Sequence, residues 1–65
     1  MLSEEQVRQA LTVMGYGKTE QFIHRCKLEV GEQEQIPVSI VREIAFSMLD
    51  RDLEEELLLR LGIYN

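Results

Sequence analysis

The stretch LSEEQVRQALTVMGY, residues 2–16, decides the fold class of this 65-residue chain, because it carries the signals of one amphipathic helix from start to end. Ser3 and Gln6 have the spacing of a capping box, in which each side chain accepts a hydrogen bond from the other residue's backbone N–H. Gly15 suits the left-handed position just after a helix. We expect a helix over residues 4–14, with apolar positions at helical spacing: Val7, Ala10, Leu11 and Met14.

The next segment, residues 19–30, also predicts a helix. Thr19 is expected as its N-cap and Gly31 as its stop, and one face is apolar: Phe22, Ile23, Cys26 and Val30. An alternative interpretation makes residues 27–30 and 35–38 two strands of a hairpin. An isolated two-stranded hairpin is only marginally stable in water, so a helix with a frayed end is favoured.

Residues 31–37 form a linker, and its last residue, Pro37, suits the first turn of a helix over residues 38–49. Asp52 and Glu55 have the spacing of a second capping pair, which would open a last helix. Without a break at Asp52, the two segments would form one kinked rod, and this alternative stays open. The sequence therefore predicts an all-α fold, a small bundle of three to four short helices forming one domain over residues 1–65.

Composition narrows the class of protein. The charge is −5, from seven Lys and Arg against twelve Asp and Glu, and 45% of the residues are hydrophobic, enough for a core. Residues 1–30 sum to zero charge, and residues 31–65, with three basic and eight acidic groups, carry the whole −5. An acidic half repels phosphate, so a nucleic-acid role would have to use the first half.

The number of cysteines and the length of the apolar runs indicate the cellular compartment. A single cysteine, Cys26, cannot form an internal disulfide and suits a reducing compartment. The longest apolar run, residues 57–59, is too short to span a bilayer, and no secretory signal is visible. We expect a soluble cytoplasmic protein without a membrane segment.

An enzyme is not expected. Cys26 and His24 stand two residues apart and point about 200° away from each other on a helix, so they cannot pair as nucleophile and base. The zinc-ligand spacings of cysteine and histidine are missing as well. We expect no catalytic residue, no metal site and no cofactor.

The loop Met14-Gly15-Tyr16, preceded by Val7 and Leu11, resembles the loop between the first two helices of ubiquitin-associated domains, which are three-helix modules that bind other proteins. The resemblance covers about 20 of the 65 residues. Beyond it, the linker 31–37 is too long and the following segment too large for that family, so no family is assigned.

Each expected helix carries one large apolar residue away from its main stripe: Val13, Leu28, Phe46 and Leu59. Ile63 and Tyr64 add apolar side chains at the end of the chain. Scattered single apolar residues on a surface are normal, but four in so short a chain predict a surface that a partner covers. A second copy would also supply the stability that a small core lacks.

The function expected first is therefore a small non-enzymatic protein–protein interaction or regulatory module, acting as a homodimer through exposed apolar helical surface. Phe46 and Leu59 are the expected anchors, with Val13 and Leu28 as lesser ones. The acidic run Glu54, Glu55 and Glu56 would form a polar rim. The alternative is a helix-turn-helix-like regulator that binds nucleic acid through residues 18–28, with positive charge from Lys18, His24, Arg25 and Lys27.

Overall fold

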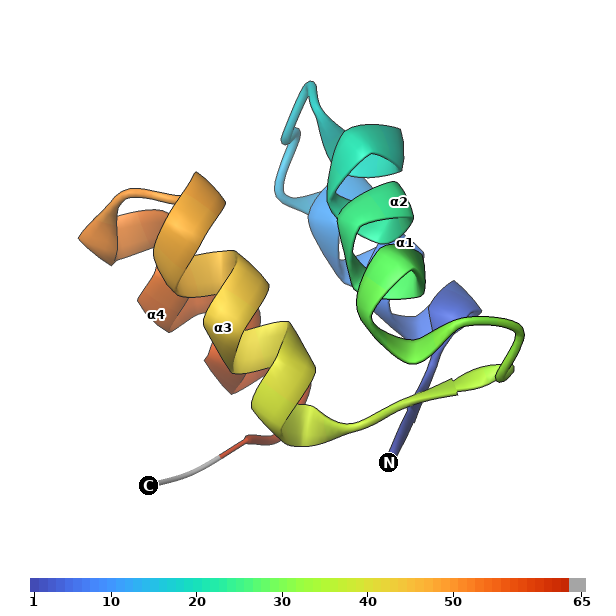
Figure 1. The fold of residues 1–65 in the computed structure, drawn as a ribbon. Helices are drawn as coiled ribbons and strands as arrows, with labels where there is room; N and C mark the ends of the chain where they lie inside the picture. Colours follow the sequence, from blue (N-terminus) through green and yellow to red (C-terminus); the bar gives the residue numbers. More distant parts are fainter. Residues whose placement is uncertain (64–65) are drawn as a thin grey trace.

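The computed structural model describes residues 1–63, and within them the chain forms four helices in the expected order (Figure 1). They are α1 (Glu4–Val13), α2 (Thr19–Val30), α3 (Val38–Met48) and α4 (Arg51–Arg60). Two strands of two residues each accompany them, β1 (Leu2–Ser3) and β2 (Gln35–Ile36). The all-α prediction is confirmed. Tyr64 lies outside the described residues.

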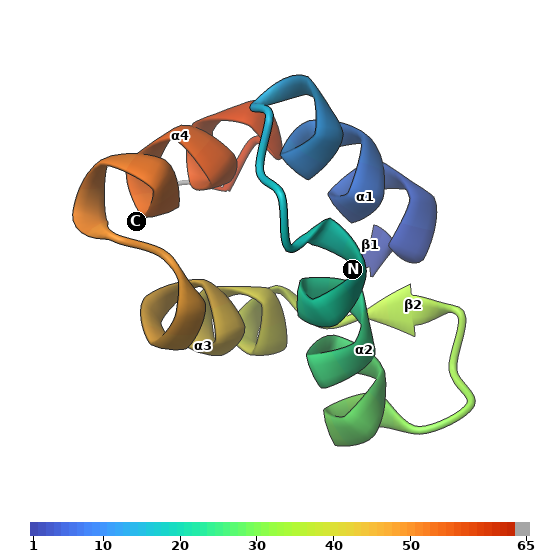
Figure 2. The same cartoon turned by 90° about the horizontal axis from the view of Figure 1, so that it is seen from above.

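The helices surround one core, with α1 and α2 on one side and α3 and α4 on the other (Figures 1 and 2). Helix α2 packs against both α1 and α3, and α4 closes the arrangement by packing against α3 and α1. The radius of gyration is 10.4 Å, against about 10.7 Å for a compact chain of this length. None of these helices is long and apolar enough to cross a membrane.

Helix α1 begins and ends as its sequence predicts. The Ser3 hydroxyl accepts a hydrogen bond from the Gln6 N–H at 3.0 Å, and the Gln6 side-chain oxygen accepts one from the Ser3 N–H at 2.8 Å. Gly15 has φ of +75°, and the Tyr16 N–H donates to the Leu11 carbonyl at 3.0 Å. This closure of the last turn needs the left-handed glycine, because an L side chain is strained there.

The N-caps of α2 and α4 differ from the sequence prediction. Thr19 is the first residue of α2, and its hydroxyl donates to the Tyr16 carbonyl at 2.7 Å, so the side chain closes the turn before the helix instead of capping it. At α4 the cap is Asp50, whose carboxylate accepts from the Leu53 N–H at 2.9 Å. Asp52 lies inside the first turn. The chain is extended at Leu49 and Asp50, so α3 and α4 are separate helices and the kinked rod is wrong.

The hairpin alternative is also wrong. Residues 27–30 are the last turn of α2, and the Gly31 N–H donates to the Lys27 carbonyl at 2.8 Å, so the end of the helix is closed. Residues 35–36 do form a strand, but it pairs antiparallel with β1, with Leu2 opposite Ile36. Both of these apolar side chains are buried, and this ties the N-terminus to the linker before α3.

The core takes unequal shares from the four helices. Helices α1, α2 and α3 each bury three residues, whereas α4 buries one, Leu57. The residues buried on the first three helices are Val7, Ala10 and Leu11, then Phe22, Ile23 and Cys26, then Val41, Ile44 and Ala45. Helix α4 is therefore the least deeply anchored helix, and this leaves open grooves on both of its sides.

Candidate functional site

The four apolar residues predicted to lie off the core are all exposed. The exposed fraction is 80% for Phe46, 70% for Leu28, 65% for Leu59 and 56% for Val13. They project from four different helices, and the structure places Phe46 and Val13 in two separate grooves. The sequence thus identified the exposed side chains but not their distribution over the surface. Ile63, expected to add to the apolar surface, is buried.

Phe46 lines a shallow groove of about 510 Å³ between α3 and α4, which we call the α3–α4 groove. Its two walls are matching helical stripes, because each wall contributes residues at positions i, i+3, i+4 and i+7. The wall from α3 consists of Ser39, Arg42, Glu43 and Phe46, and the wall from α4 consists of Arg51, Glu54, Glu55 and Leu58. The half-buried Leu58 extends the hydrophobic core to this groove.

The predicted acidic rim is divided. Glu54 and Glu55 line the α3–α4 groove, and Glu55 pairs with Arg51 at 3.5 Å within α4. Glu56 does not line the groove: its carboxylate accepts from Arg60 at 2.9 Å, one helical turn further along. Two acidic groups of the three therefore flank Phe46, together with the guanidinium groups of the groove walls.

Sequence reasoning missed Leu58 and Arg51 as groove residues. Neither residue was expected on a binding surface. A usable signal existed, since counting back four and seven residues from Leu58 gives Glu54 and Arg51 on one helical stripe. That stripe faces a groove only because α4 folds back along α3, which the sequence pattern does not state.

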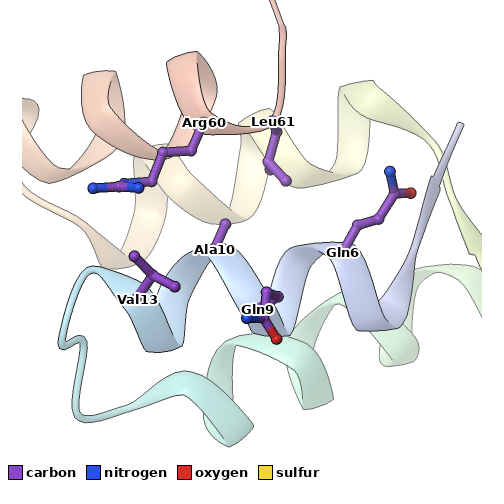
Figure 3. A pocket seen from close by; sticks show the side chains of 6 residues that line it. All are labelled: Gln6, Gln9, Ala10, Val13, Arg60 and Leu61. Carbon is purple, nitrogen blue, oxygen red and sulfur yellow. The ribbon is translucent and has the colours of Figure 1, made fainter.

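Val13 lines a second groove, of about 320 Å³, between α1 and α4 (Figure 3). Ala10 and Val13 project from α1 toward α4, where Arg60 and Leu61 face them (Figure 3). Arg60 is the charged residue of this lining, which Gln6 and Gln9 complete. Because the side chain of Ala10 is small, it does not fill this groove.

The basic residues of the nucleic-acid alternative do not gather on one face of α2. Lys27 bonds Glu4 of α1 through its ammonium group at 3.1 Å, and Arg25 donates to the Ser47 hydroxyl of α3 at 2.9 Å. Arg25 and Lys27 are two residues apart, which is about 200° around the helix axis, so their side chains reach neighbouring helices on opposite sides of α2. Lys18 precedes the helix, and His24 lines a hollow with Arg25 and the acidic Glu20. The alternative stays an untested prediction that this geometry does not favour.

The ion pairs of the first half join α1 to α2. Arg8 bonds Glu20 across the two helices at 2.7 Å and also contacts Glu4 and Glu5 on its own helix. Hydrogen bonding to Arg8 lowers the pKa of Glu20, and hydrogen bonds from Arg8 and then Lys27 lower the pKa of Glu4. The same contacts, led by Glu20, raise the pKa of Arg8, so the cluster stays ionised at neutral pH.

Cys26 lies in the core, and burial raises the pKa of its thiol to about 11. The nucleophilic thiolate is therefore scarce at neutral pH. His24 is exposed on another side of α2, as its spacing from Cys26 predicts. Within residues 1–63, no group of three or more His, Cys, Asp or Glu side chains could hold a metal ion.

Comparisons with known proteins found no relative of this chain. No protein-family model, no curated protein and no solved structure matches this chain.

Proposed function

We propose that this chain is a small non-enzymatic protein–protein interaction module, of regulatory type, which acts as a homodimer through its exposed apolar helical surface. The observation that supports the proposal most is Phe46, a large aromatic side chain that is 80% exposed and lines a groove with the half-buried Leu58. Aromatic side chains of this kind carry a disproportionate share of binding energy at interfaces.

The exposed apolar residues have no role in the core that would explain them. Val13, Leu28, Phe46 and Leu59 each lie on the outer side of a helix, where a polar residue would cost nothing in packing. A second copy that covers part of this surface removes apolar area from water, at about 25 cal/mol per Å². The free, buried Cys26 suits a reducing compartment, so the proposal places the protein in the cytoplasm.

The experiment is a comparison of the wild type with a variant in which all four residues are alanine: V13A, L28A, F46A and L59A. Sedimentation equilibrium from micromolar to millimolar chain concentration is expected to give a dimer for the wild type and a 7.6 kDa monomer for the variant. Alanine favours helix, so far-UV circular dichroism should stay the same. A wild type that remains a 7.6 kDa species over the whole range would overturn the proposal, whether or not the variant folds.

A further inference from the structure

The α3–α4 groove combines an anchor with charges of both signs. Phe46 is the anchor, and Leu58 supplies half-buried apolar surface on the opposite wall. Around them lie the guanidinium of Arg51, which is 88% exposed, and the carboxylates of Glu54 and Glu55. An aromatic residue inside a ring of polar groups is the usual composition of an interface centre.

Charges of both signs indicate what kind of partner fits. In a two-fold symmetric dimer the same patch lies on both sides, so an acidic group can face a basic one only if the patch holds both. The groove beside Val13 lacks this property, because Arg60 is its charged residue. In a third hollow, formed by Glu4, Glu5 and Glu34, the basic residue is Arg8, which bonds three carboxylates at 2.7–3.2 Å and is 29% exposed. Arg51 has one such contact, at 3.5 Å, and is 88% exposed.

The accessible surface of the chain indicates how far the dimer interface must extend. The described chain exposes 4233 Å², close to the about 4300 Å² of a monomeric protein of this mass, so the fold is closed without a partner. A stable dimer buries about 800 Å² per subunit, roughly a fifth of this surface. The contact must therefore extend beyond the groove. Leu59 is exposed and stands four positions after the groove residue Glu55 on α4, so we expect such an extended contact to include it.

We propose that a second copy of this chain docks in the α3–α4 groove, with Phe46 of each copy packed against Leu58 of the other and Arg51 of each copy facing Glu54 and Glu55 of the other. This inference rests on the proposed function and specifies its surface. It makes the dimer isologous, so each contact occurs twice.

The first test is Phe46→Ala, with Val13→Ala as the matched control outside the groove. We expect Phe46→Ala to raise the dissociation constant of the dimer by about 30-fold or more, and Val13→Ala to change it by less than about threefold. Both side chains are exposed, so urea unfolding at chain concentrations well below the dissociation constant of the dimer should show little change in the stability of the monomer. A dimer equally strong in both variants would overturn the assignment of the groove.

The second test exchanges charges between copies. Arg51→Glu alone and the pair Glu54→Arg with Glu55→Arg alone place like charges opposite each other, and each should weaken the dimer about tenfold. An equimolar mixture of the two variants should form a heterodimer within about threefold of wild-type affinity. Neither variant keeps the Arg51–Glu55 pair within α4, so recovery can come only from contacts between copies.

The control for this exchange is Glu29→Arg on α2, which also reverses an exposed acidic side chain but lies outside the groove. Its mixture with Arg51→Glu keeps only one of the two symmetric charge contacts, so that heterodimer should stay clearly weaker than the one formed by the complementary pair of variants. The outcomes separate the two proposals. A monomeric wild type refutes both proposals, because no second copy then docks on the chain. A wild-type dimer that is lost in the four-alanine variant, but insensitive to Phe46→Ala and to the charge exchange, refutes only the groove.

Discussion

The molecule has two halves, α1 with α2 and α3 with α4, and their ion pairs are arranged differently. Both halves leave two large apolar side chains exposed, so apolar content does not distinguish them. In the first half, Arg8–Glu20 and Lys27–Glu4 cross between the helices and fasten them together. In the second half, Arg51–Glu55 and Arg60–Glu56 lie within α4. The second half therefore presents ionised groups around Phe46 that a partner can meet.

The halves also differ in how deeply their last helix is anchored. Helix α2 buries three residues, whereas Leu57 is the one buried residue of α4, and Leu53 and Leu61 are half-buried beside it. This difference indicates that α4 depends on a single core side chain and on its caps. Substitutions at this core position and at the helix caps test that dependence.

Leu57→Ala should destabilise the fold by about 2–5 kcal/mol, because it removes a fully buried side chain and leaves a cavity. A domain of this length has a total stability of about 3–10 kcal/mol, so much of the folded population is lost. Urea unfolding followed by far-UV circular dichroism measures the change.

Leu59→Ala is the matched control, two positions along the same helix. Leu59 is exposed in the single chain, so at chain concentrations too low for the dimer the free energy of unfolding should change by less than about 0.5 kcal/mol. Equal effects at both positions would mean that α4 is not anchored through Leu57, and the contrast with α2 would fail.

Asp50→Ala should cost about 1 kcal/mol, because it removes the acceptor for the Leu53 N–H at the start of α4. Asp52→Ala should cost less, because this carboxylate only interacts favourably with the helix dipole in the first turn. Thermal unfolding of the two variants distinguishes them. A larger loss at Asp52 would restore the capping pair that the sequence suggested and contradict the observed cap.

Ser3→Ala applies the same change to the first half. It removes one of the two hydrogen bonds of the capping box of α1, the one from the Gln6 N–H. We expect the free energy of unfolding to fall by about 1 kcal/mol here too, so both halves should depend to a similar degree on their helix caps. A much smaller effect would show that the pairing of β1 with β2 holds the start of α1 without the cap.

The ion pairs between α1 and α2 should make the first half sensitive to acid. Contacts with Arg8, first of all, hold the pKa of Glu4 and of Glu20 below the ordinary value of 4.5. Their contribution to stability is therefore present above pH 4.5 and is lost as the pH falls through the lower folded-state values. Arg8→Gln should be less stable at neutral pH and should lose less stability on acidification than the wild type.

Unfolding midpoints in urea at neutral pH and at steps below pH 4.5 measure this dependence. Arg51→Gln is the control, since its pair with Glu55 lies within one turn of α4 and is largely exposed. These surface pairs are screened by solvent, so the effect should be the smallest of the series. Parallel pH curves for wild type and Arg8→Gln would contradict the link between the two helices.

The sequence predicted those features that depend on neighbouring residues. The capping box at Ser3 and the glycine closure at Gly15 are as expected, because each involves residues within about one helical turn of one another. The exposure of Phe46 also followed from its angle on the helix. Local spacing did not predict the cap at Asp50, because Asp50 and Asp52 both suit that position in sequence and the path of the chain after α3 decides between them.

Other features needed contacts between distant residues. The strand at residues 35–36 exists because Leu2 pairs with Ile36, 34 positions away, and no local pattern encodes that partner. The contact made by Lys27 also depends on a distant residue. Its positive charge made it a candidate to bind nucleic-acid phosphate, but its ammonium group bonds Glu4 of α1. The α3–α4 groove likewise requires two stripes on separate helices to face each other.

Local sequence patterns suffice to predict that this chain is all-α, where its helices end to within one or two residues, and that Val13, Leu28, Phe46 and Leu59 lie outside the core. The helical period and the caps suffice for these features, because they act over three to seven residues. Helix packing decides which exposed side chains share a groove and which charges are paired between helices. Those properties depend on how whole helices pack, since the packing of the buried faces fixes the position of every outward-facing residue.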